Sequence, residues 1–294
     1  MEVTISIINY NYGQYLIEAI ESALNQTTNA VYEVLVIDDG STDNSDEIIA
    51  TYQSNAKFRS SKTENRGFAA ALSRALTEAR GEYVFFMDSD DHFLTNKLEF
   101  ILPIMKKNNF FFVADSPKPF DLMGTIYKHN NAAGCTSTVV VNRKKALLLC
   151  PVENEIWYNS LYQLGLGIYL NETYTNYRMH NSSMTNRSIP GKQNAYLSNI
   201  THNLSNQLAR ESTNIAKGLG VPISKVIKVS NFYKSQAYYN EVEMHLELAS
   251  RLIAFKSFIK MFYFGIISKN KIQLFDLKML LKIIVLKPSN KFRI

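Results

Sequence analysis

The sequence predicts an α/β fold, in which a mostly parallel sheet is flanked by helices and followed by an α-helical C-terminal extension. Short apolar or β-branched runs alternate with helical patterns along residues 3–107, which is typical of right-handed βαβ units. Two of these runs end in aspartates, at the carboxyl ends where open α/β sheets bind ligands. After Gln193 the pattern is helical almost throughout. We therefore expect two domains, residues 1–192 and residues 193–294.

The first domain opens with a regular succession of elements. Strands are recognised as short apolar runs and helices as apolar stripes at helical spacing. In chain order we predict strand 3–8, helix 14–25, strand 33–37, helix 44–52, helix 69–79, strand 83–87 and helix 95–107. Ser41 or Asp43 can cap the helix that follows them. Gly81 stands where a helix should end, and Pro103 shortens or kinks the last helix.

The pattern weakens between residues 110 and 149. We predict strands at 110–114 and 136–141, then a helix at 156–164 and a strand at 169–177. In the C-terminal domain, a Gly- and Pro-containing stretch at 218–222 breaks the helical pattern.

Charge is unevenly distributed along the chain. Residues 251–294 carry ten Lys or Arg and one acid, Asp276, which is a net charge of +9; since the whole chain has +6, residues 1–250 carry −3. This distribution argues against a nucleic-acid-binding body and indicates a tail with its own partner.

Two stretches of the tail, residues 241–267 and 272–286, alternate bulky apolar residues with lysines. Such helices are suited to lying in an anionic membrane surface, although packing on the first domain with solvated lysines is the alternative. No stretch has the roughly 18 uncharged apolar residues of a membrane span. Cys135 and Cys150 match no zinc or redox motif and are expected to be reduced thiols. Without a basic-then-apolar leader, we expect a cytoplasmic protein, peripheral on the inner face of the cell membrane.

Three carboxylates follow the predicted strand 83–87 within four positions: Asp88, Asp90 and Asp91. Carboxylates this close repel one another unless a cation lies among them. Asp88 and Asp90 are two residues apart, so both can point to one side of an extended segment. One interpretation is a Mg²⁺ or Mn²⁺ site that holds a phosphorylated substrate. The other is a solvated acidic turn, in which Asp90 or Asp91 caps the next helix.

Asp38 and Asp39 close the predicted strand 33–37. Because parallel strands present their carboxyl ends at one edge of a sheet, we expect these acids to line the same crevice as the acids at 88–91. Asp39 can accept a hydrogen bond from a nucleotide base or from ribose hydroxyls. Aspartates at strand ends also serve as caps or turn residues, and this alternative stays open.

Four stretches together resemble the family 2 glycosyltransferases, which have the GT-A, Rossmann-like fold. They are residues 6–11 (SIINYN) with the helix end at 23–27, residues 36–43 (VIDDGSTD), residues 65–67 (NRG) with 81–91, and residues 177–180 (YRMH). The resemblance covers about residues 1–190, and its specificity lies in the order and spacing of the stretches. The sequence has no Gly-rich phosphate loop of the G-x-G-x-x-G or Walker type.

The resemblance implies inverting transfer of a sugar from a nucleotide-sugar donor, UDP-linked, to a hydroxyl of a glycan or lipid-linked acceptor in bacterial surface polysaccharide synthesis. It implies a Mn²⁺ or Mg²⁺ cofactor that bridges the donor diphosphate. It assigns the metal to Asp90, Asp88 and His180, and it places Asp91 near the sugar or acceptor as a catalytic candidate. The implied nucleotide-sugar contacts are Asn9, Asn11, Asp39, Asn65, Arg66, Asp88, Ser89 and Arg178.

Inverting transfer also needs a carboxylate that takes the proton of the attacking hydroxyl. The family carries this base shortly before a Leu-Trp helix, and counting back from Trp157 places Glu153 at that position. Glu155 is a second candidate. Both glutamates can instead simply supply negative charge to a first helical turn.

Departures from the family pattern leave a second function open. Leu72 and Ser73 stand where the family has an Arg-Asn pair, so a phosphate contact is lost or is supplied by Arg66 or Arg74. The alternative is a catalytically weak or inactive GT-A protein that binds a nucleotide-sugar or serves as an assembly partner, and an oligomer is compatible with either. A nucleotidyltransferase would need a Gly- and Lys/Arg-rich loop after the first strand, which residues 9–13 do not provide.

Overall fold

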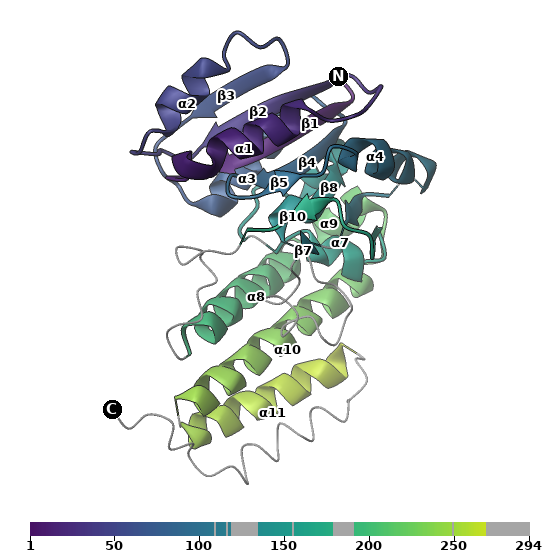
Figure 1. Cartoon of the computed structure of the whole chain (residues 1–294). Coiled ribbons are helices and arrows are strands. Elements are labelled where there is room, and N and C mark those ends of the chain that lie inside the picture. The colour runs from purple at the N-terminus through teal and green to yellow at the C-terminus, as the bar shows by residue number, and fades with distance from the viewer. Residues whose placement is uncertain are drawn as a thin grey trace, which may run out of the picture. The chain divides into compact units, whose positions relative to one another are not determined.

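The computed structural model covers the whole chain and describes residues 1–108, 110–115, 117–118, 135–154, 156–178, 191–248 and 250–268. The chain forms two compact units, Met1–Met179 and His180–Ile294 (Figure 1). The first unit is built around a sheet, and the second is helical.

Seven strands form the main sheet of the first unit, in the order β3-β2-β1-β4-β8-β6-β9. Neighbouring strands are parallel except where β8 pairs with β4 and with β6. The predicted class, an α/β fold with a mostly parallel sheet, is therefore confirmed. The strands are β1 (Val3–Asn9), β2 (Tyr32–Asp38), β3 (Phe58–Lys62), β4 (Tyr83–Asp88), β6 (Phe112–Ala114), β8 (Val139–Asn142) and β9 (Gly167–Tyr169).

A second, smaller sheet has the order β5-β10-β7. Its strands are β5 (His92–Phe93), β10 (Thr175–Asn176) and β7 (Pro117–Lys118). Strand β5 follows the acidic residues 88–91 directly, so the small sheet holds the chain just beyond them.

Helices cover the main sheet, which is why its central strands β1, β2 and β4 are buried almost throughout. Val3, Ile5 and Ile7 of β1 share one core cluster with buried side chains of α1 and α4. Helix α3 contacts β1 and β2, but its buried side chains are not part of that cluster. The helices of this unit are α1 (Gly13–Leu24), α2 (Ser45–Thr51), α3 (Phe68–Glu78), α4 (Lys97–Asn108), α6 (Arg143–Ala146) and α7 (Asn159–Gln163), with the 3₁₀ turns η1 (Thr136–Thr138) and η2 (Leu147–Leu149).

The weakly patterned region differs from the sequence prediction in detail. Strand β3 was not predicted, because its sequence FRSSK has one large apolar residue. The predicted strand 136–141 begins as the 3₁₀ turn η1 and becomes extended only at Val139. The predicted strand 169–177 is two short strands in different sheets, β9 and β10.

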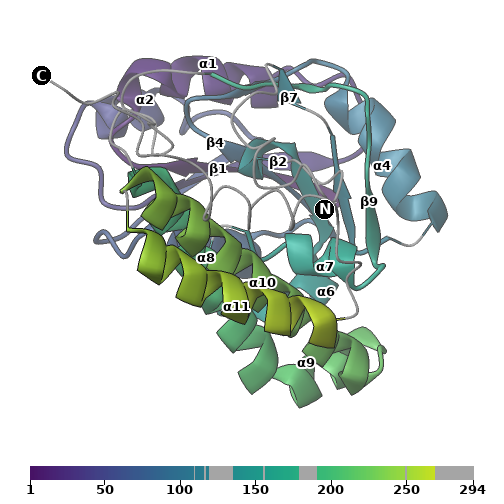
Figure 2. The same ribbon diagram turned by 90° about the horizontal axis from the view of Figure 1, so that it is seen from below.

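The second unit consists, in its described part, of α8 (Lys192–Arg210), α9 (Ser212–Leu219), α10 (Ile223–Glu247) and α11 (Arg251–Ile267). Figures 1 and 2 show α10 lying alongside α8 and α11, with which it makes its main contacts. The predicted helix 241–267 is divided at residues 248–250, and the predicted helix 272–286 lies outside the described residues. Within the described parts of the chain, no helix combines the length and apolarity needed to cross a membrane.

Candidate functional site

Residues 88–91, at the end of β4, form a tight turn that we call the acidic turn. The Asp91 N–H donates to the Asp88 carbonyl oxygen at 3.1 Å, and the Ser89 N–H donates to the carbonyl of Ile8 on β1 at 3.1 Å. Carboxylate oxygens of Asp88, Asp90 and Asp91 lie within 4.8 Å of one another. The carboxylates therefore converge because the chain turns, not because the segment stays extended. Three hard oxygen donors at this separation fit a Mg²⁺ or Mn²⁺ ion.

Asp91 is the buried member of this acidic turn, with 1% of its surface exposed. Its Oδ2 accepts from the Ser137 hydroxyl at 2.5 Å, and its Oδ1 accepts from the Arg178 N–H at 2.8 Å. Burial and then the charge of Asp90 raise the pKa of Asp91 to about 7, against these hydrogen bonds and the charge of Lys97. The turn thus gathers three acids in a place where burial and mutual repulsion disfavour the ionised form of Asp91.

A fully buried lysine lies behind the turn. The Lys97 ammonium donates to Asp115 Oδ1 at 2.7 Å, to the Ser137 carbonyl at 2.8 Å and to Thr175 Oγ1 at 2.7 Å. These bonds join α4, the residue that follows β6, η1 and β10. Sequence reasoning missed Lys97, Ser137 and Asp115; the available signal was a lysine at the start of the apolar stripe of α4.

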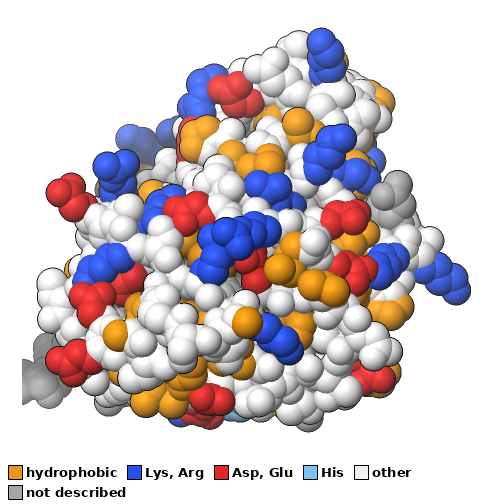
Figure 3. Space-filling model, turned by 90° about the horizontal axis from the view of Figure 1, so that it is seen from above, with side chains coloured by type: hydrophobic (Ala, Val, Ile, Leu, Met, Phe, Trp, Pro, Cys, Tyr) orange, Lys and Arg blue, Asp and Glu red, His pale blue; other side chains and the backbone are white. Residues whose placement is uncertain are grey.

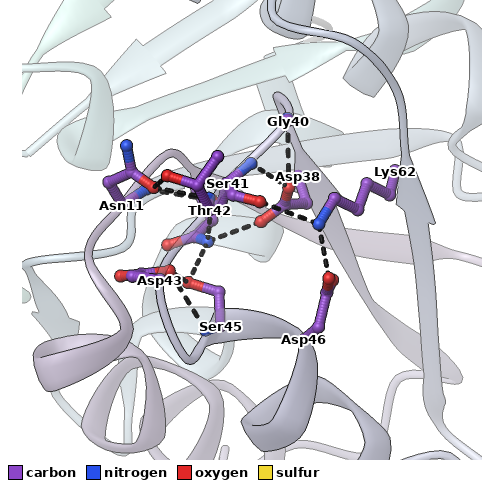
Figure 4. A network of polar contacts seen from close by, with 10 residues as sticks. Asn11, Asp38, Gly40, Ser41, Thr42, Asp43, Ser45, Asp46 and Lys62 are labelled. Atoms are coloured by element: carbon purple, nitrogen blue, oxygen red, sulfur yellow. Dashed lines mark hydrogen bonds and ion pairs between the residues drawn. The ribbon is translucent and has the colours of Figure 1, made fainter.

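The loop after β2 is held by a second polar network (Figure 4). The buried Asn9 side chain donates to Asp38 Oδ2 at 2.7 Å and to the hydroxyls of Ser41 and Ser45 at 3.1 and 2.9 Å. Asn11, which has a left-handed φ of 57°, accepts from the Thr42 N–H at 2.8 Å through Oδ1. The predicted nucleotide contacts of Asn9 and Asn11 stay predictions, and in this structure both side chains shape the loop.

Lys62 closes the other side of this loop. Its ammonium donates to the Ser41 carbonyl at 2.8 Å and to Asp46 Oδ2 at 2.5 Å, as Figure 4 shows. Sequence reasoning did not single out Lys62, since β3, on which it lies, was itself not predicted.

Asp39 binds the loop that leads into α3. Its two carboxylate oxygens accept from the N–H groups of Arg66 and Gly67 at 3.0 and 2.9 Å. Gly40 has a φ of 82°, and a Cβ there would lie 2.7 Å from the Asn65 backbone nitrogen, so only glycine allows this approach. Asp39, Asn65 and Arg66 thus lie close together, and their predicted nucleotide-sugar contacts stay predictions.

The two acidic strand ends lie at the same edge of the sheet. Strand β1 pairs in parallel with both β2 and β4, placing Asn9 opposite Asp38 and Ile8 opposite Asp88. Only one strand therefore separates them, which corresponds to about 10 Å at ordinary strand spacing.

Arg178 connects the acidic turn to α1. Its Nε donates to the Asp90 carbonyl at 2.9 Å, its Nη2 pairs with Glu18, and the guanidinium lies 4.9 Å from the centre of the Tyr15 ring. His92 Nδ1 is 3.2 Å from the same Glu18 carboxylate. A diphosphate contact by Arg178 stays a prediction, and in this structure its charge is directed to Glu18, which sequence reasoning did not single out.

The base candidate Glu153 is exposed and lies in a loop fastened to α3. The Val152 N–H donates to the Ser73 hydroxyl at 2.8 Å, so Ser73 holds this loop, while Leu72 is buried in the core. Arg74 donates hydrogen bonds to the Glu78 carboxylate. It also donates to the hydroxyls of Ser61 on β3 and of Thr63, which follows β3. The candidates Glu155 and His180 lie outside the described residues.

Comparison with known proteins decides the family. A family model described as Glycosyl transferase family 2 matches residues 4–179. The chain belongs to glycosyl transferase family 2. The matched residues contain both acidic strand ends and every described site candidate, so the family 2 region coincides with the sheet unit, which ends at Met179.

Relatives of this family 2 chain include bacterial glycosyltransferases. It is 34% identical over 151 residues to an uncharacterized glycosyltransferase of Rickettsia bellii, covering 51% of this chain and 21% of that protein, so the chain spans about a fifth of that relative's length. It is 29% identical over 203 residues to the Escherichia coli UDP-Glc:alpha-D-GlcNAc-diphosphoundecaprenol beta-1,3-glucosyltransferase WfaP, covering 62% of this chain and 79% of that protein.

Two solved structures share the fold of this family 2 chain. Residues 1–349 of S. aureus TarS, in complex with UDP-GlcNAc, match with a TM-score of 0.57 at 15% identity, over 90% of this chain and 91% of that one. The mannosyltransferase PcManGT from Pyrobaculum calidifontis, in complex with GDP-Man and Mn²⁺, matches with a TM-score of 0.55 at 14% identity, over 97% and 87%. At this identity the likeness concerns the fold, which is the expected GT-A type.

Proposed function

We propose that the protein is an inverting, metal-dependent glycosyltransferase that moves a sugar from a nucleotide-sugar to a hydroxyl of its acceptor. The observation that carries this proposal is the acidic turn, whose three carboxylates converge within 4.8 Å at the carboxyl edge of the sheet. The loop that contains Asp39 stands at the same edge, one strand away. Membership of family 2 supports the reaction class.

Asp90 and Asp88 would hold a Mn²⁺ or Mg²⁺ ion, together with His180. A divalent cation bound there would neutralise the donor diphosphate and the charge that develops on the departing nucleotide. The Mn²⁺ named with the PcManGT structure supports this assignment. Asp91, buried and hydrogen-bonded on both oxygens, would keep the turn in shape beneath the sugar.

The nucleotide side of the donor would lie against the loops that follow β2 and β3. Asp39 already gathers these loops through two backbone N–H groups, and each carboxylate oxygen keeps a second lone pair for a ribose or base donor. The other proposed donor contacts are Asn9, Asn11, Asn65, Arg66, Ser89 and Arg178.

Glu153 is the proposed base that accepts the proton of the attacking hydroxyl. It is exposed, as a group that meets an acceptor must be, and the Val152–Ser73 hydrogen bond limits the movement of its loop. Glu155 remains the second candidate.

The proposed donor is a UDP-sugar, and the proposed acceptor is a glycan or lipid-linked sugar of a bacterial surface polysaccharide. The names of the WfaP relative and of the TarS complex both support UDP as the carrier. The WfaP name also supports a lipid-diphosphate-linked acceptor. Figure 3 shows Lys and Arg side chains interspersed with Asp and Glu over one face of the molecule, which does not favour a nucleic-acid partner.

A thermal-shift screen of UDP-, GDP- and TDP-sugars with and without Mn²⁺ tests donor and cation together. A ligand that binds only the native state stabilises it by RT ln(1 + [L]/Kd). We expect a UDP-sugar to raise the unfolding temperature only when Mn²⁺ is present. Equal shifts with and without the metal would contradict metal dependence. Release of free UDP without an acceptor would then separate an enzyme from a protein that only binds the donor.

A lipid-linked acceptor agrees with an exposed apolar face on α11. Leu252, at 71% exposure, and Tyr263, at 60%, lie on this face with the exposed side chains of Phe255, Ile259, Phe262 and Ile266. Ala254, Ser257 and Met261 form the buried face instead. Lys256 and Lys260 are exposed beside the apolar face, as in helices that lie in an anionic membrane surface. We propose that this face contacts the inner leaflet.

Flotation of the full-length chain with anionic and with neutral liposomes tests this contact. Ile259→Glu places a charge in the proposed face, where Ile259 is 54% exposed, and Val31→Glu, at an exposed apolar position (66%) in the sheet unit, is the matched control. We expect Ile259→Glu alone to reduce the fraction bound to anionic liposomes. Equal binding by both variants would refute a role for α11.

A further inference from the structure

The Ser137 hydroxyl joins the two ends of the acidic turn. Its Oγ donates its single proton to Asp91 Oδ2 at 2.5 Å and accepts from the Asp88 N–H at 2.9 Å. Ser137 is fully buried in η1, 46 residues along the chain from Asp91. One side chain from a distant segment therefore contacts both the residue that opens the turn and the residue that closes it.

Lys97 fixes the backbone of Ser137 from behind. The three protons of its ammonium are directed at the Ser137 carbonyl, Asp115 Oδ1 and Thr175 Oγ1, all between 2.7 and 2.8 Å. The side chains of Lys97 and Asp115 are both 0% exposed, so the ion pair is shielded from solvent. A buried pair of this kind is costly to break, because either partner alone would be an uncompensated charge. The Ser137 hydroxyl is thus presented from a rigid support.

We propose that Ser137 is a positioning residue that presets the carboxylates of the acidic turn for a divalent cation before the cation binds. This inference rests on the proposed metal site of the glycosyltransferase. Groups that hydrogen-bond metal ligands orient them, and removing such a group typically weakens metal affinity about 10- to 100-fold. Without the Ser137 hydroxyl, the Asp91 carboxylate would keep, within the described residues, only its bond from the Arg178 N–H, and the Asp88 N–H would lose its acceptor.

Direct Mn²⁺ binding tests the inference without any transfer reaction. The electron paramagnetic resonance signal of free Mn²⁺, titrated against the full-length protein, gives the dissociation constant. We expect Ser137→Ala to raise it about 10-fold and Ser137→Thr, which keeps the hydroxyl, to restore tighter binding. Ser6→Ala is the matched control, because Ser6 is also fully buried and its hydroxyl has no hydrogen-bond partner within the described residues. It should bind Mn²⁺ like the wild type.

The outcomes separate this inference from the metal site itself. A wild-type protein that binds no Mn²⁺ would overturn the proposed metal site and the inference together. A wild type that binds Mn²⁺ as tightly as Ser137→Ala would overturn only the positioning role. The same holds if Ser137→Ala lowers the metal-free unfolding temperature while leaving the Mn²⁺ dissociation constant unchanged, because Ser137 would then be merely structural. If Ser137→Thr does not fold, the comparison of Ser137→Ala with Ser6→Ala still decides.

Discussion

Glu33 and Asp91 are both buried carboxylates, but Glu33 lies on β2 near the amino edge of the sheet, and Asp91 lies in the turn after β4 at the carboxyl edge. Glu33 accepts from Arg59 Nε at 2.8 Å, from the Thr4 hydroxyl at 2.8 Å and from the Arg80 N–H at 2.9 Å. Burial acts to raise the pKa of Glu33, but these hydrogen bonds and the Arg59 charge outweigh it, and the pKa is lowered.

Asp91 has no such compensation from its immediate partners, a hydroxyl and a backbone N–H. Burial and the neighbouring Asp90 carboxylate prevail, and the pKa of Asp91 rises to about 7. The fold therefore keeps one acid ionised beside a cationic partner near the amino edge, and at the carboxyl edge it disfavours the ionised form of an acid that lies beside a like charge. A carboxyl whose ionised form the protein itself disfavours indicates a functional site, where a bound cation would stabilise the ionised form.

Asp90→Ala should have the largest effect on activity. Removing a proposed metal ligand should abolish sugar transfer, a loss of at least about 10³-fold, and should abolish the Mn²⁺-dependent thermal shift with donor. Coupled release of UDP and donor thermal shift measure the two. Glu99→Ala, an exposed acid on α4, is the control and should transfer sugar normally. If Asp90→Ala transferred sugar at the wild-type rate, the proposed metal site at the carboxyl edge would be refuted.

Glu153→Gln should separate binding from chemistry at the same edge. Because general-base catalysis contributes about 10²- to 10⁴-fold, we expect turnover to fall by this factor while donor affinity stays within about twofold. Steady-state kinetics of UDP release with acceptor, together with donor titration, provide the two quantities. Near-normal turnover would transfer the role of base to Glu155 or Asp91.

Glu33→Gln should affect stability instead of metal binding. The substitution leaves the partly buried Arg59 without its charge partner, at a cost of about 3 kcal/mol in the free energy of unfolding. Urea unfolding measures this cost, with Glu99→Gln as the exposed control. The Mn²⁺ dissociation constant should not change. If Glu33→Gln kept its stability but no longer bound Mn²⁺, the proposed division between a stabilising amino edge and a metal-binding carboxyl edge would be wrong.

The smallest expected effect is a change with pH in the contribution of Glu33 to the free energy of unfolding. The pKa of Glu33 is lower in the folded protein than the ordinary value of 4.5, so the unfolded chain binds the proton more readily. Its stabilising contribution is complete above that value and is lost as the pH falls through the folded pKa. The difference in unfolding free energy between wild type and Glu33→Gln should therefore shrink as the pH decreases from about 6 to below 4. A constant difference across this range would show that Glu33 does not act through its charge.

Strong local patterns account for the elements that were predicted well. Strands β2 and β4 contain continuous apolar runs, strand β1 is rich in β-branched residues, and helices α1 and α3 have apolar stripes at helical spacing. The segments with mixed composition were predicted less well. Residues 136–141 are β-branched except for Ser137, yet the first three form η1, in which Ser137 hydrogen-bonds the acidic turn.

The sequence by itself determined the sheet class, the acidic residues at two strand ends and, through four spaced stretches, the family. Each of these depends on residues close together in the chain, whose periodicity and order are visible without coordinates. Only the tertiary structure decided that Ser137, Lys97 and Asp115 support the acidic turn, and that Glu18 pairs with Arg178. These contacts join segments from 18 to 160 residues apart, and a polar residue's partner depends on which segments burial brings together, which no local pattern encodes.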